Sequence, residues 1–78
     1  MPTVLRLGDV EVMIYTHDHE PMHVRVFRAE SEVVINLEDV SVREAREASG
    51  RIQRQAQEIV AANREFLMNE WTRINPIS

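Results

Sequence analysis

The sequence contains no cysteine and no lysine among its 78 residues. The absence of cysteine excludes stabilisation by disulfides and any metal site built from thiolates. The absence of lysine means that all nine basic residues are arginines, whose flat guanidinium groups suit phosphates and carboxylates. A GC-rich genome produces the same bias, so the arginine content alone identifies no ligand.

Long apolar runs are missing as well. No stretch approaches the roughly 20 apolar residues that a membrane-spanning helix needs. The start of the chain also lacks the basic and apolar segments of a secretory signal. Only two glycines and three prolines occur, and 44% of the residues are hydrophobic, which is typical of a folded chain. We therefore expect a soluble, cytoplasmic protein with a single domain over residues 1–78.

The formal net charge of −4 disfavours a protein that relies on general electrostatic attraction to nucleic acid. The nearest approach to a basic patch is a group of four arginines, interspersed with glutamates: Arg43, Arg46, Arg51 and Arg54. The default interpretation of this group is a solvated helix face.

Residues 1–37 contain four short runs of alternating apolar residues, separated by three turns. The first turn, Gly8-Asp9, suits a two-residue type II′ hairpin with glycine leading. It pairs Leu7 with Val10, Arg6 with Glu11, Leu5 with Val12 and Val4 with Met13. The third turn is interpreted as a four-residue loop, 29–32, which pairs Arg28 with Val33 and Val26 with Ile35. The middle turn is longer, and its register stays open.

In this arrangement the correctly alternating aliphatic residues share one face of the sheet. The opposite face receives a mixture of apolar and reactive residues: Val4, Arg6, Glu11, Met13, Tyr15, His23, Arg25, Phe27, Val34 and Asn36. We expect any function to lie on this second face.

After Leu37 the period changes. Ser41 and Glu44 have the spacing of a capping box, so residues 38–50 are interpreted as a connector with a short helix. A short strand through Val40 and Val42 is the alternative. Over residues 51–75, apolar residues recur at helical spacing and predict one long helix of about six turns that ends before Pro76. The predicted fold is therefore α+β, a four-stranded antiparallel meander packed on one face by a long C-terminal helix.

Large apolar residues gathered on an uncovered sheet face indicate an interaction surface. The residues predicted to bind a partner there are Val4, Met13, Tyr15, Phe27 and Val34. The partner is either a second copy of the chain or a different protein. A few scattered apolar groups on a solvated face are the alternative.

His23, Arg25 and Tyr15 share the predicted second face and are the candidate catalytic residues. A histidine can move a proton near neutral pH, and an arginine on the same side of the strand can hold a phosphate. The combination suits metal-independent cleavage of RNA, with Tyr15 assisting. A polar rim around a protein interface explains the same residues without catalysis.

The loop with His17, Asp18, His19, Glu20 and His23 contains side chains that can bind zinc. A solvated loop is the commoner explanation, so we assign no metal site and expect no cofactor. Asn63 interrupts the apolar stripe of the predicted helix, where it either reaches a ligand or bonds a free backbone group at the end of a strand. Trp71 is expected to anchor the core.

Several segments together resemble the bacterial family known as domain of unknown function 4160. They are residues 1–6, Val12-Met13-Ile14-Tyr15, residues 20–26, Ile35-Asn36-Leu37-Glu38, residues 60–65, and Trp71. The positions that match the family pattern are Tyr15, Glu20, His23, Asn63 and Trp71. Many relatives have a second histidine where this chain has Arg25, which weakens any role that needs two imidazoles.

The resemblance implies a function that the residue patterns do not. Such proteins are often encoded beside a small partner and are regarded as toxins of toxin–antitoxin pairs. We therefore expect the toxin component of a bacterial two-protein module, acting on RNA and binding its partner through the second sheet face. A non-enzymatic module for protein interaction or dimerisation is the alternative.

Overall fold

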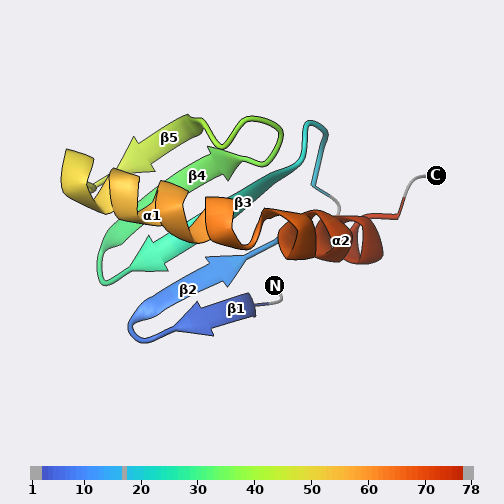
Figure 1. Ribbon diagram of the computed structural model, residues 1–78, viewed down its shortest axis with the longest axis horizontal. Helices are drawn as coiled ribbons and strands as arrows, with labels where there is room; N and C mark the ends of the chain where they lie inside the picture. Colours follow the sequence, from blue (N-terminus) through green and yellow to red (C-terminus); the bar gives the residue numbers. More distant parts are fainter. Residues whose placement is uncertain (1–2, 17, 77–78) are drawn as a thin grey trace.

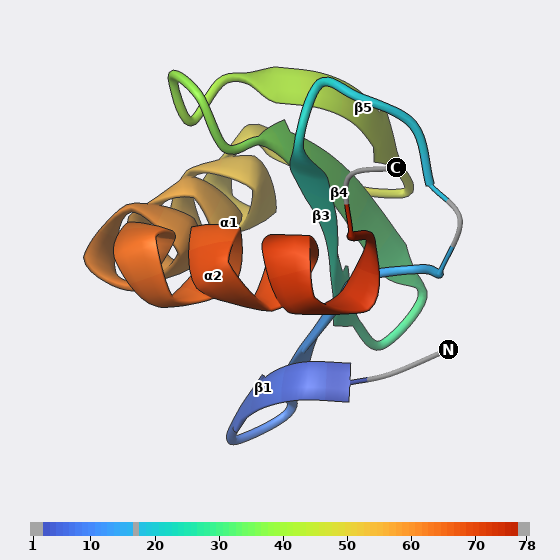
Figure 2. The ribbon, with the colours of Figure 1, turned by 90° about the vertical axis from the view of Figure 1, so that its right-hand side faces the viewer.

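Five antiparallel strands form one sheet in the computed structural model, which describes residues 3–16 and 18–76. The strands lie in sequence order across the sheet, and two helices lie end to end on one side of it (Figures 1 and 2). The elements are β1 (Thr3–Leu7), β2 (Val10–Met13), β3 (His23–Arg28), β4 (Ser31–Asn36), β5 (Val42–Arg46), α1 (Gly50–Ala62) and α2 (Arg64–Ile74). The α+β class is confirmed. The predictions of four strands and of one long helix are wrong.

The fifth strand lies in the segment that was predicted to be a connector with a short helix. Ser41 does not cap a helix there, because its hydroxyl donates to the Asp39 carboxylate over 2.6 Å. The alternative interpretation, a short strand through Val40 and Val42, is correct only in part: β5 begins at Val42 and pairs with β4, whereas Val40 precedes it with a φ of 59°. The serine that caps a helix is Ser49, whose hydroxyl oxygen accepts a hydrogen bond from the Ile52 backbone N–H at the start of α1.

The predicted long helix is divided at Asn63. This residue has φ −122° and is the C-cap of α1, and its side-chain amide donates to the Ile59 carbonyl over 2.8 Å. The next residue, Arg64, donates to the carbonyls of Leu37 and Glu38 in the turn between β4 and β5. The junction between the helices is therefore tied to the sheet. Asn63 does bond a free backbone group, although that group belongs to a helix and not to a strand.

The first hairpin has the predicted register from Leu5 to Val12, and Gly8 has a φ of 61°. The pairing of Val4 with Met13 is wrong, because the strand has a bulge there and Thr3 pairs with Met13. The third turn contains two residues rather than four, so Arg28 pairs with Ser31 and Val26 with Val33. This shift of two positions does not change which residues of β3 and β4 alternate to each face of the sheet, because sheet faces alternate with a period of two.

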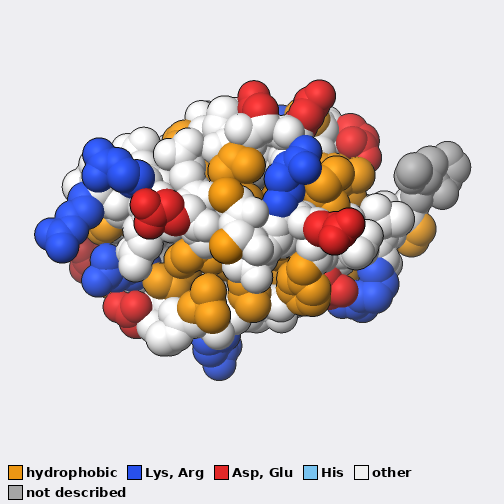
Figure 3. Space-filling view, viewed as in Figure 1, with side chains coloured by type: hydrophobic (Ala, Val, Ile, Leu, Met, Phe, Trp, Pro, Cys, Tyr) orange, Lys and Arg blue, Asp and Glu red, His pale blue; other side chains and the backbone are white. Residues whose placement is uncertain are grey.

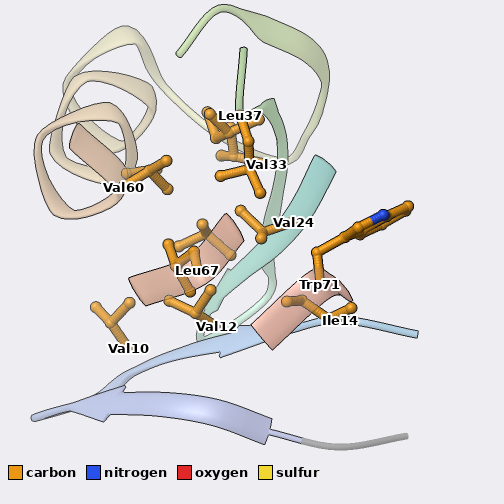
Figure 4. Close-up of a cluster of buried hydrophobic side chains, with 12 residues drawn as sticks. Val10, Val12, Ile14, Val24, Val33, Leu37, Val60, Leu67 and Trp71 are labelled. Carbon is orange, nitrogen blue, oxygen red and sulfur yellow. The ribbon is translucent and has the colours of Figure 1, made fainter. Parts of the chain in front are cut away.

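The core lies between the sheet and the two helices (Figure 4). Side chains from β2, β3 and β4 meet Val60 of α1 and Leu67 of α2, while the Trp71 indole extends toward one end of the sheet. The buried cluster comprises Val10, Val12, Ile14, Val24, Val26, Val33, Ile35, Leu37, Ala56, Val60, Leu67 and Trp71. Trp71 is 2% exposed, which confirms its predicted role as a core anchor.

Leu5 and Leu7 lie at the margin of this core. Leu7 is 44% exposed, because the helices cover β4 and β5 more closely than β1. Among the residues that the structure describes, no helix has the length and apolar character needed to cross a membrane.

Candidate functional site

The sheet face turned away from both helices carries two rows of side chains that cross the strands. Directly opposite residues on paired strands share a face, so the pairings define each row. One row runs Arg6, Glu11, Phe27, Glu32 and Arg46, and the other runs Met13, Arg25, Val34 and Glu44. We call these two rows, together with Tyr15 and Asn36, the open face. No helix in the described part of the chain covers it (Figure 2).

Arg25 occupies the centre of the open face. Its guanidinium carbon lies 4.7 Å from the centroid of the Tyr15 ring, which is a cation–π arrangement. Its Nη1 atom donates to the Glu32 carboxylate over 2.8 Å, and Arg46 bonds the other oxygen of that carboxylate. Two arginines therefore share one glutamate, and the Tyr15 ring is fixed beside them.

Met13, Tyr15 and Phe27 are half-buried and lie outside the core cluster, so they are the apolar groups that this face presents. Val34 also lies on this face, but it is 2% exposed and enclosed by longer neighbours. Val4, at the bulge in β1, packs against the core cluster instead. Two of the five predicted partner-binding residues are thus placed where they offer little contact area.

His23 differs most from its expected position. The alternation places it on the open face, but its side chain is only 4% exposed. Its Nδ1 atom lies 3.0 Å from the Pro21 carbonyl oxygen, and its Nε2 atom lies 3.0 Å from Asp18 Oδ2. The Trp71 ring lies 5.2 Å from the imidazole between centroids. The prediction of a solvent-facing imidazole is wrong, because the start of β3 lies beneath the end of α2.

The residues around His23 are held in place by the end of α2. The Asn75 side chain accepts a hydrogen bond from the Asp18 backbone N–H and donates to the Tyr15 carbonyl, each over 3.0 Å. This one amide therefore connects the helix end to both sides of the segment before β3. This role is not predictable from the sequence, because Asn75 next to Pro76 indicates only the end of a helix.

The structure brings together two of the three candidate catalytic residues. Tyr15 and Arg25 are in contact, whereas both ring nitrogens of His23 are occupied by Asp18 and Pro21. Both ring nitrogens already lie within hydrogen-bond distance of a protein oxygen, so neither is free to accept a substrate proton. The arrangement is suited to binding at Tyr15 and Arg25 and to support at His23.

A comparison with protein families matches residues 10–72 to the family described as Domain of unknown function (DUF4160). The chain belongs to this family. The match confirms the resemblance carried by the sequence motifs, and the description names no activity. Comparisons with curated proteins and with solved structures find no significant match.

Two of the motif positions that carry the DUF4160 resemblance contact one another, namely His23 and Trp71. A third, Asn63, ends α1, and a fourth, Tyr15, stacks on Arg25. The fifth, Glu20, is exposed. Three of the five motif positions, His23, Asn63 and Trp71, therefore shape the fold of this DUF4160 chain. Tyr15 lies instead on the open face.

The loop considered for metal binding offers no cluster among residues 3–16 and 18–76, where no three His, Asp or Glu side chains converge. His17 lies outside the described residues. His19 is exposed, and its backbone N–H donates to the Asp18 side chain. His23 already bonds Asp18 and Pro21.

The four arginines interpreted as one solvated helix face are divided between two elements. Arg43 and Arg46 lie on β5, whereas Arg51 and Arg54 lie on α1. Arg51 and Arg54, but not Arg43 or Arg46, line an open cavity of about 640 Å³ beside the start of α1, together with Arg28, Ser49, Ile52, Gln55 and Glu58. Figure 3 shows basic side chains gathered at this end of the molecule. The sequence did not reveal that Arg28 joins them, because it comes from β3.

Proposed function

We propose that this chain is the toxin-like member of a two-protein module and that it binds its partner protein through the open face. The observation that carries the proposal is the Arg25–Tyr15 stack, which lies beside Met13, the cross-strand partner of Arg25, on a face that no described helix covers. In this proposal the chain acts by binding. It does not use His23 as a proton carrier.

The composition of the face supports a protein partner. Aromatic residues, methionine and arginine are enriched in the cores of protein interfaces, and Tyr and Arg are common among residues that dominate binding energy. The Arg6–Glu11 and Arg46–Glu32 ion pairs flank the apolar centre and provide a polar rim. Arg25 is already held by Glu32 and Tyr15, so little side-chain entropy remains to be lost when a partner binds.

The test uses Phe27→Glu, which introduces a charge into the apolar centre of the open face. Phe66→Glu is the matched control, because Phe66 lies on α2 and is 45% exposed. The chain is co-expressed with the product of the adjacent gene, and the pair is purified through a tag on the adjacent protein. We expect Phe27→Glu to abolish co-purification and Phe66→Glu to preserve it. Loss of co-purification in both variants, or in neither of them, contradicts binding through the open face.

The toxin role has its own readout, which is growth of a bacterial host after induction. We expect the wild-type chain to arrest growth, the adjacent gene product to relieve the arrest, and Phe27→Glu to be harmless. Normal growth with soluble wild-type protein contradicts the toxin role and leaves the non-enzymatic interaction module. Sedimentation of the chain alone, compared with that of Phe27→Glu, then distinguishes a homodimer formed through this face from a chain that uses the face to bind another protein.

Action on RNA is a second candidate, favoured by the arginine-lined cavity. Arg28, Arg51 and Arg54 face a single glutamate there, Glu58, although the chain as a whole carries a net charge of −4. Arginine forks suit phosphate oxygens. We expect fluorescence anisotropy to detect salt-dependent binding of a short single-stranded RNA that Arg51→Glu weakens and Arg6→Glu leaves unchanged. Binding that is insensitive to Arg51→Glu contradicts an RNA site in this cavity.

A further inference from the structure

We propose that β5 pairs with β5 of a second copy of this chain about a two-fold axis centred on Ala45. The proposal concerns an edge of the sheet and does not depend on partner binding by the open face. Its basis is the charge pattern of residues 43–47, which is Arg-Glu-Ala-Arg-Glu.

The outer edge of β5 is accessible. β5 is the last strand of the sheet and pairs only with β4 among the described strands. In Figures 1 and 2 none of the described helices or strands lies beyond it. Its residues from Arg43 to Arg46 are exposed. An unpaired strand edge offers backbone groups that a second strand can satisfy.

The backbone of Ala45 has the orientation that such pairing needs. The Asn36 backbone N–H donates to Ser41, which places Asn36 among the β4 residues that bond toward β5. Alternation along β4 then gives Val34 and Glu32 the same direction, so their partners Glu44 and Arg46 bond toward β4. The N–H and C=O of Ala45, which lies between those two partners, point outward to the free edge.

Charge then selects one register. With Ala45 opposite Ala45 of the second copy, Glu44 lies opposite Arg46 twice, and Arg43 flanks Glu47 twice. Centring the axis on Glu44 opposes two glutamates, and centring it on Arg43 or Arg46 opposes two arginines. Opposite charges across strands are favourable by roughly 0.2–1 kcal/mol per pair, and like charges are unfavourable. Only the Ala45 register has attractive pairs throughout.

The available side chains fit this arrangement. Among the described residues, Arg43, Glu44 and Glu47 form no ion pair within the chain. Arg46 is 70% exposed and bonds only one Glu32 oxygen, so its other donors are free to meet Glu44 of the second copy. A small residue, alanine, lies at the axis, where a bulky side chain would meet its own copy. The paired sheets would join their two open faces into one continuous surface.

The bulge at Arg43 and the positive φ of Glu47 shorten the regular part of the edge. The interface is therefore small and rich in charge, and we expect association that depends on concentration and weakens with salt. Sedimentation velocity of the wild-type chain up to millimolar concentration, at low and high salt, is the first measurement. A monomer under all these conditions overturns the proposal.

Two charge reversals provide the decisive test. Glu44→Arg opposes two pairs of arginines across the axis, and Arg46→Glu opposes two pairs of glutamates. We expect each variant alone to be monomeric and an equimolar mixture of the two to recover the dimer, since every opposed pair is then Arg–Glu. Circular dichroism confirms that both variants are folded. A mixture that stays monomeric while the wild type dimerises overturns the β5 interface.

A third variant, Arg6→Glu, is the control for a broken ion pair at a sheet edge. Arg6 pairs with Glu11 on β1, at the opposite edge from β5. We expect this variant to dimerise like the wild type. Loss of the dimer in Arg6→Glu, with the fold intact, would assign self-association to the open face or the β1 edge and contradict the proposal.

Discussion

The His23 imidazole lies against the Trp71 indole at the end of the sheet, with the ring planes inclined by 52°. This contact joins the first residue of β3 to the last buried residue of α2, 48 positions later in the chain. Asp18 and Pro21 bond the two nitrogens of the imidazole, so the histidine links three segments.

Replacing this histidine is expected to destabilise the fold. His23→Ala removes the contact with Trp71 and leaves the Asp18 carboxylate, 20% exposed, without its partner. We expect a loss of about 2–4 kcal/mol in the free energy of unfolding, measured by urea denaturation. His19→Ala, in the same connection but exposed, is the control and should change stability by less than about 0.5 kcal/mol. Equal effects of the two changes would contradict a structural role for His23.

The Tyr15–Arg25 stack is expected to contribute a measurable coupling energy. A double-mutant cycle with Tyr15→Leu and Arg25→Met removes each group separately and then together. We expect a coupling of about 0.5–1 kcal/mol, as for a partly exposed cation–π pair. Thermal unfolding of the four proteins gives the value. A coupling near zero would show that the two side chains contribute independently to stability.

A turn residue with an unfavourable backbone angle provides a stabilising change. Ala29 has a φ of 52°, in the left-handed region that favours glycine. Ala29→Gly is expected to raise the free energy of unfolding by about 0.5–1 kcal/mol, because relief of the left-handed strain exceeds the added chain entropy. Glu30→Gly, the neighbouring change, should lower it. Destabilisation by Ala29→Gly would contradict a left-handed conformation of Ala29 in a two-residue turn.

Acid should weaken the turn between β4 and β5. Hydrogen bonds from Ser41, chiefly from its hydroxyl, hold the pKa of the Asp39 carboxyl below its ordinary value of 3.8. A lowered pKa in the folded state stabilises the protein above pH 3.8, and this contribution disappears as the pH falls through the folded value. We expect Asp39→Asn to be less stable than the wild type at neutral pH, with the difference shrinking in acid. Urea unfolding across pH 2–7 measures it, and a difference that grows toward low pH would contradict this sign.

Local signals in the sequence were sufficient for part of the fold. Gly8 marks a turn whose geometry it suits, and the register of the first hairpin from Leu5 onward was predicted correctly from it. The position of the third turn is predicted wrongly, because Ala29 adopts a left-handed conformation that alanine does not favour. The faces were still correct there, since two misplaced residues restore the same alternation.

Other features depend on contacts between distant segments. Ser41 and Glu44 have capping-box spacing, but pairing of β5 with β4 prevails over that local preference. The break at Asn63 was not predicted because apolar spacing continues through it, although the asparagine in the apolar stripe was a partial signal. Burial of His23 could not be predicted at all, since it depends on where the end of α2 lies.

The hydrogen bonds of the Asn75 side-chain amide also affect the open face. The amide holds the Tyr15 carbonyl, while the phenol ring of the same tyrosine rests on Arg25. Unwinding of the last turn of α2 would therefore free the backbone of Tyr15 and weaken the contact between the Tyr15 ring and the Arg25 guanidinium. A ligand that binds at the end of α2 and displaces the Asn75 side chain would therefore change the position of Tyr15 on the open face.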